Sequence, residues 1–95
     1  MQAEIKLWRY VIKRAILDAC AIFEDSKPYR NKKEFLLECR EWFHTEDCET
    51  VCQYAQLDKS FVYHLYKNAN WSYKNASLRS SLLSALLDKI LERTK

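Results

Sequence analysis

One set of side chains in this sequence has a spacing that could bind a metal. His44, Cys48 and Cys52 are spaced four residues apart, so on one continuous helix they would share a face and could supply three zinc ligands. The sequence has no C-x-x-C pair, and Cys39 is the nearest candidate for a fourth ligand. Small thiols at helical spacing are more often part of a hydrophobic core. We therefore expect reduced, buried cysteines, no metal and no other cofactor.

The sequence also lacks the arrangements that are typical of enzymes. His44 and His64 are the only histidines, and neither lies in a motif that pairs a nucleophile with its base. Because the chain has no glycine, it has neither a glycine-rich phosphate loop nor a nucleophile elbow. The carboxylates are scattered at the spacing of helix surfaces. We predict that the protein is not an enzyme.

Composition favours helices joined by polar corners. The 95-residue chain has no glycine and one proline, whereas sheets joined by tight turns usually need glycine. Hydrophobic residues make up 48% of the chain and aromatic residues 14%, which suffices for one modest core. We predict a single all-α domain over residues 1–95, a compact bundle of about five helices.

Apolar periodicity and capping residues divide this domain into elements. A long amphipathic helix is expected from about Glu4 to Asp25, with basic residues such as Lys6, Arg9 and Lys13 largely on its solvated back. The other expected elements are a helix from Asn31 to Phe43, a helix from Glu46 to Ala55 capped by Thr45, a helix from Lys59 to about Asn68, a loop over 68–75 in which Trp71 closes the core, and a last helix over about 76–93.

Two of these helices meet at a tight corner within residues 47–67. Asp58 begins the second of them as an N-cap, because its carboxylate can accept the free N–H groups that open a helix. The apolar and small residues on both sides of the corner are Val51, Cys52, Ala55, Leu57, Val62 and Leu65.

This pattern resembles the helix-turn-helix of bacterial and phage DNA-binding proteins, which has a small residue midway in its first helix and apolar residues flanking the turn. Gln56 stands where the family usually has glycine, and a non-glycine residue adopts the required positive φ at a cost of about 1 kcal/mol. The order of elements over residues 7–66 is also similar to small prophage-encoded proteins. The resemblance implies a sequence-specific transcriptional regulator of phage or prophage type.

The second helix of the corner is the expected DNA reader. Its outward polar residues, able to meet base edges and phosphates in a major groove, are Lys59, Ser60, Tyr63, His64 and Lys67. The resemblance implies that Lys67 lies nearest the backbone and the others nearest the bases. Auxiliary contacts to phosphates are expected from Lys32, Lys33, Lys74 and Arg79. An alternative for the 68–75 loop is that its aromatic and basic side chains grip DNA or stack on an unpaired base.

The distribution of charge favours this interpretation more than the net charge of +3 does. Residues 44–58 contain acidic residues and no lysine or arginine, whereas residues 59–87 contain basic residues and no acidic one. The sign of the charge therefore reverses at the corner. The alternative is a solvated surface with a chance asymmetry.

The last helix carries more leucine than one core-facing side needs. One stripe contains Leu78, Leu82, Leu86 and Ile90, and the adjacent stripe contains Leu83, Leu87 and Leu91. The surplus predicts a partner, most simply a second copy of the chain.

A competing interpretation is a small protein–protein interaction module that recruits or inhibits a host protein, or contacts RNA polymerase, without binding DNA. The chain has no export signal and no transmembrane run, so we expect it in the bacterial cytoplasm and not at a membrane.

Overall fold

A computed structural model describes residues 2–22 and 32–93 of the chain. Within these ranges the secondary structure is entirely helical, which confirms the all-α class with about five helices. The elements are α1 (Ala3–Ala19), α2 (Lys32–Glu41), the short 3₁₀ helix η1 (Trp42–His44), α3 (Glu46–Tyr54), α4 (Lys59–Asn75) and α5 (Ser80–Arg93).

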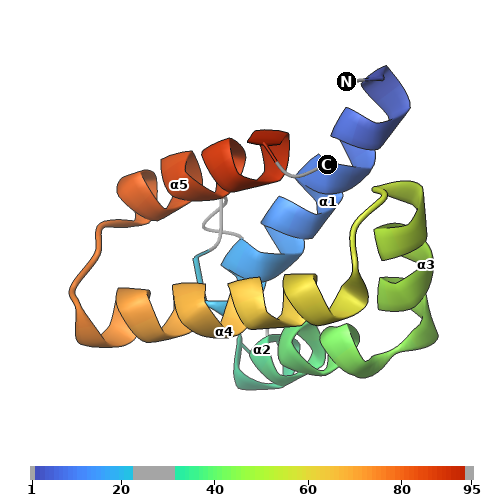
Figure 1. Ribbon diagram of the computed structural model, residues 1–95. Coiled ribbons are helices and arrows are strands. Elements are labelled where there is room, and N and C mark those ends of the chain that lie inside the picture. Colours follow the sequence, from blue (N-terminus) through green and yellow to red (C-terminus); the bar gives the residue numbers. More distant parts are fainter. Residues whose placement is uncertain (1, 23–31, 94–95) are drawn as a thin grey trace.

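Helix α1 is the centre of the bundle and contacts each of the other four α-helices. Figure 1 shows α4 and α5 running in opposite directions, with α3 beside the start of α4 and α2 at the bottom of the view, below α4. Ile12 and Ile16 of α1 have no exposed surface, since they lie where these helices converge. Phe43 of η1 is equally buried and stacks on Tyr66 of α4, with 4.5 Å between ring centroids.

Arg9 of α1 is buried, although the helical pattern placed it on a solvated back. Its Nε donates to the Ala55 carbonyl at 2.9 Å, and its Nη1 donates to the Leu91 carbonyl at 2.6 Å. Both carbonyls belong to the C-terminal ends of helices, where acceptors lack partners within the helix and the dipole favours a cation. Arg9 therefore ties the ends of α3 and α5 to α1.

The first helix ends at Ala19, six residues before the predicted boundary at Asp25. Ala21 adopts a φ of 66°, and the Ile22 N–H donates to the Leu17 carbonyl at 2.9 Å. This is the hydrogen-bond pattern of a Schellman motif, which ends a helix by turning one residue into the left-handed region. Phe23 and the predicted capping residue Asn31 lie outside the described residues.

The predicted loop at 68–75 is wrong, because α4 continues without a break to Asn75. Ala69 is buried and Tyr73 packs against the core, so tertiary contacts outweigh the weak helix propensity of the asparagines. Trp71 does not close the core, since 63% of its surface is exposed. The last helix begins at Ser80, four residues later than the predicted start near Ala76.

Candidate nucleic-acid interface

The corner between α3 and α4 is defined by capping interactions at both helices. The Gln56 N–H donates to the Gln53 carbonyl at 3.1 Å, and the Leu57 N–H donates to the Cys52 carbonyl at 2.9 Å. Together with a φ of 56° at Gln56, these two bonds make a second Schellman motif. The expected positive φ at Gln56 is thereby confirmed.

The predicted N-caps of both α3 and α4 are also confirmed. Thr45 Oγ1 accepts from the Cys48 N–H at 3.3 Å at the start of α3, and Asp58 Oδ1 accepts from the Ser60 N–H at 2.8 Å at the start of α4. Side-chain oxygens in this role satisfy donors that have no partner in the first helical turn. The direction in which α4 leaves α3 is therefore specified by local hydrogen bonds.

One side of α4 carries a continuous row of exposed side chains opposite its buried side. Successive members are four, three, four and three residues apart, a spacing that places them in line along a helix. We call this row the outer stripe of α4; it consists of Ser60, His64, Lys67, Trp71 and Lys74, all exposed. The sequence of α4 contains no Asp or Glu, so the charge along the outer stripe is positive.

Lys59 and Tyr63, two further predicted contact residues, are only partly exposed. Lys59 Nζ donates to the Thr45 carbonyl at 3.5 Å, so this ammonium group turns back toward the start of α3. The Tyr63 ring lies 5.2 Å from the ring of His44 and 6.2 Å from that of His64, measured between centroids. These two residues lie at the edge of the outer stripe and not at its centre.

The auxiliary basic residues occupy different places. Lys74 belongs to the outer stripe, and Arg79 is exposed in the connection between α4 and α5. Lys33 is exposed in the first turn of α2, whereas the side chain of Lys32 lies outside the described residues. The outer stripe therefore unites Ser60, His64, Lys67 and Lys74 of the predicted set, and it adds Trp71, which sequence reasoning assigned to the core.

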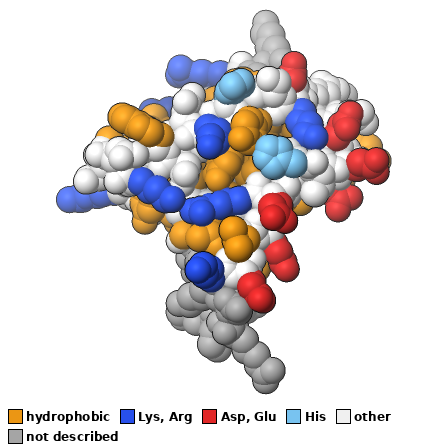
Figure 2. Space-filling model, turned by 90° about the horizontal axis from the view of Figure 1, so that it is seen from below, with side chains coloured by type: hydrophobic (Ala, Val, Ile, Leu, Met, Phe, Trp, Pro, Cys, Tyr) orange, Lys and Arg blue, Asp and Glu red, His pale blue; other side chains and the backbone are white. Residues whose placement is uncertain are grey.

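Acidic side chains border this positive surface at one end. Glu46, Asp47 and Glu49 are exposed in the first turn of α3, where the helix dipole favours negative charge. Figure 2 shows basic, histidine and apolar side chains across the underside of the molecule, with acidic side chains toward the side of α3 and others lower in the view. The predicted reversal of charge at the corner thus corresponds to two regions of the surface.

The thiols of Cys48 and Cys52 are buried and lie 3.9 Å apart, measured between their sulfur atoms. Burial raises the pKa of both thiols, that of Cys52 to about 12, although the charge of Lys59 acts in the opposite direction. The His44 ring, the third member of the considered zinc set, packs on Tyr63. Among the described residues, no group of three or more His, Cys, Asp or Glu side chains is placed to hold a metal ion.

In the part of the chain that the structure describes, every helix is too short or too polar to cross a membrane. No protein-family model matches this chain, and comparisons with curated proteins and with solved structures give no match either.

Proposed function

We propose that this protein is a non-enzymatic, sequence-specific DNA-binding regulator of phage or prophage type that acts in the bacterial cytoplasm. The observation that carries the proposal is the outer stripe of α4, which begins at a capped corner and continues for the whole helix. With 17 residues, α4 is about 25 Å long, and its exposed side can follow a stretch of major groove.

The residues of the outer stripe suit different parts of a duplex. Ser60 and His64 lie near the N-terminal end of α4, where recognition helices present side chains to base edges. Lys67 and Lys74 lie farther along and would pair with phosphates. The acidic first turn of α3 would be repelled by phosphates, so it favours one orientation of the protein on DNA over the reverse.

The test is fluorescence anisotropy with labelled duplexes of random sequence, followed by selection of preferred sequences. We expect affinity to fall steeply between about 50 and 200 mM salt, because phosphate contacts release counterions. Lys67→Ala should weaken binding and lower the slope of log affinity against log salt by about one. Lys89→Ala, which removes an equal charge from the exposed surface of α5, should change neither quantity.

Two results would contradict the proposal. One is the absence of salt-dependent binding to any duplex, including DNA upstream of the gene itself. The other is an equal effect of Lys67→Ala and Lys89→Ala, because binding would then reflect overall charge and not the outer stripe.

A second candidate function, a protein–protein interaction module, is favoured by the exposed apolar side of α5. Leu82 is 53% exposed, Leu86 45% and Ile90 37%. Leu83 and Leu87, which belong to the adjacent leucine stripe, are instead core residues with 3% and 1% of their surfaces exposed. The partner would be a second copy of the chain, RNA polymerase or a host protein.

Sedimentation equilibrium of the protein and of a Leu82→Gln, Leu86→Gln double variant tests the homodimer. If α5 mediates it, the double variant should be monomeric at concentrations where the native chain is dimeric. Leu7→Gln is the matched control, since Leu7 is 59% exposed on α1. A monomeric native chain would exclude the homodimer and leave RNA polymerase or a host protein as the partner. Pull-down experiments with the same variants would then distinguish these two partners.

A further inference from the structure

A pocket of about 470 Å³ lies between α1, α2 and α3, on residues that the proposed DNA interface does not use. Its size is within the range of about 300–1,000 Å³ that is usual for pockets binding small molecules. The apolar part of its wall includes Val11, Ala15, Phe35, Trp42 and Val51. Such a wall suits an aliphatic or aromatic body, because burying that body removes apolar surface from water.

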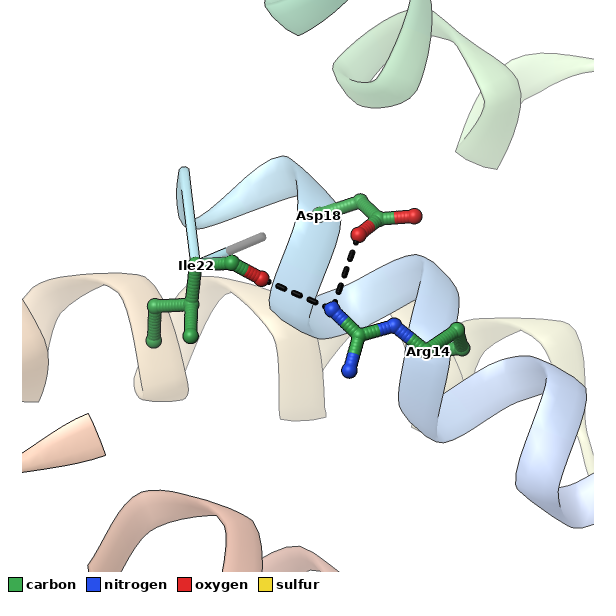
Figure 3. Close-up of polar contacts among 3 residues, drawn as sticks. All are labelled: Arg14, Asp18 and Ile22. Atoms are coloured by element: carbon green, nitrogen blue, oxygen red, sulfur yellow. Dashed lines mark hydrogen bonds and ion pairs between the residues drawn. The ribbon is translucent and has the colours of Figure 1, made fainter. Parts of the chain in front are cut away.

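The polar part of the wall contains an arginine, Arg14, that is hydrogen-bonded to other residues of the protein. Arg14 Nη2 donates to Asp18 Oδ1 at 3.0 Å and to the Ile22 carbonyl at 2.8 Å. Figure 3 shows that the second carboxylate oxygen of Asp18 points away from this guanidinium group. Arg14 therefore holds Asp18 in place through a charge-assisted hydrogen bond.

The carboxylates of Asp18 and Glu38 act on the Cys39 thiol in the wall of the pocket. Burial raises the pKa of the Cys39 thiol, and the carboxylates of Asp18 and Glu38 raise it further. Both carboxylates and the thiol line the same pocket. A ligand that brings a positive charge to this place would be stabilised, and a ligand that brings a negative charge would be repelled.

We propose that the pocket binds a small organic cation. Its apolar body would lie on Val11, Ala15 and Val51, with its ammonium group toward Asp18 and Glu38. Trp42 is also in the wall, and an aromatic ring attracts a cation that lies over its face. This site is separate from the outer stripe of α4, so the proposal stands or fails independently of DNA binding.

The experiment compares three compounds with one apolar body and different end groups: 4-phenylbutylammonium, 4-phenylbutanol and 4-phenylbutyrate. Each is titrated into the full chain, and binding is followed by the amide NMR shifts of residues such as Ala15, Phe35 and Val51. We expect saturable shifts at these residues, with the ammonium compound binding about tenfold more tightly than the carboxylate and the alcohol between them.

Two exposed carboxylates of α2 provide matched variants for the same titrations. Glu38→Gln should weaken binding of the ammonium compound about threefold and leave binding of the alcohol unchanged. Glu41→Gln removes the same charge from the same helix outside the pocket and should change neither. Equal binding of the three compounds, shifts confined to other residues, or no saturable binding would overturn the proposal.

Discussion

Arg9 replaces backbone partners that two helix ends lack, and its removal should therefore destabilise the whole domain. In Arg9→Met, which keeps much of the side-chain volume, the carbonyls of Ala55 and Leu91 would lose their buried donors. We expect a loss of about 3 kcal/mol in the free energy of unfolding, measured by urea denaturation. Lys6→Met removes a charge from an exposed position one turn earlier and should cost less than about 0.5 kcal/mol. Equal losses would show that Arg9 stabilises only through its charge.

The buried thiol of Cys52 should make stability depend on alkaline pH. Its pKa is raised from the ordinary 9.0 to about 12, so the folded state retains a proton that the unfolded state releases above pH 9. The resulting stabilisation is fully present below pH 9 and is lost as the pH rises toward 12. Melting temperatures measured over this range should therefore fall more steeply for the native chain than for Cys52→Ala. Parallel curves would contradict this assignment, because lysines and tyrosines titrate in both proteins.

The turn that follows α3 contains Gln56, a residue type that is not optimal for the backbone conformation at this position. Gln56 has a φ of 56°, a conformation that costs a residue with a Cβ atom about 1 kcal/mol and glycine very little. Gln56→Gly should therefore raise the free energy of unfolding by about 0.5–1 kcal/mol, measured by urea denaturation. Gln53→Gly, three residues earlier within α3, should lower it by a similar amount. A loss in both variants would show that the side chain of Gln56 makes a contact that outweighs its strain.

The extension of α4 to Asn75 gives Trp71 a different expected role from that of Trp42. Because Trp71 is 63% exposed, Trp71→Ala should leave the free energy of unfolding within about 0.5 kcal/mol of the native value. It should nevertheless weaken DNA binding severalfold if the outer stripe meets the duplex. Trp42→Ala should instead destabilise the fold, since Trp42 packs edge-on against Phe43. Anisotropy and urea denaturation, applied to both variants, separate these effects.

The elements that sequence reasoning located well are those specified by local interactions. Thr45 and Asp58 are N-caps as expected, and Gln56 has the expected positive φ, because each of these features depends on hydrogen bonds within a few residues. The helix-turn-helix assignment and its DNA contacts remain predictions.

The errors arise where long-range packing decides the structure. The end of α4 depends on Ala69 and Tyr73 meeting the core, and the burial of Arg9 depends on helix ends far away in sequence. The pocket between α1, α2 and α3 was not predictable for the same reason, since its wall joins residues from Tyr10 to Val51.

At the scale of the whole molecule, the contacts of α1 should make folding cooperative. It contacts all four other α-helices, so a cavity beneath it should weaken every interface together. Ile16→Ala should lower the free energy of unfolding by about 3–4 kcal/mol, a large part of the roughly 5–15 kcal/mol that is usual for a folded protein. Circular dichroism and tryptophan fluorescence should report one coincident unfolding transition. Leu7→Ala, at an exposed site on the same helix, should change the free energy of unfolding little. Separate unfolding transitions of the two signals in Ile16→Ala would contradict the central role of α1.

The bond between Arg9 and the Leu91 carbonyl holds the last turn of α5 against the N-terminal half of α1, so the start of α1 and the end of α5 lie on the same side of the bundle, as Figure 1 also shows. A circularly permuted chain could therefore join them through a short linker and open the backbone at Ser77, between α4 and α5. The permutant would preserve all five α-helices and release the positive φ of 51° at Ser77. This bundle is accordingly suited to insertion into a loop of another protein, whose two attachment points would sit close together.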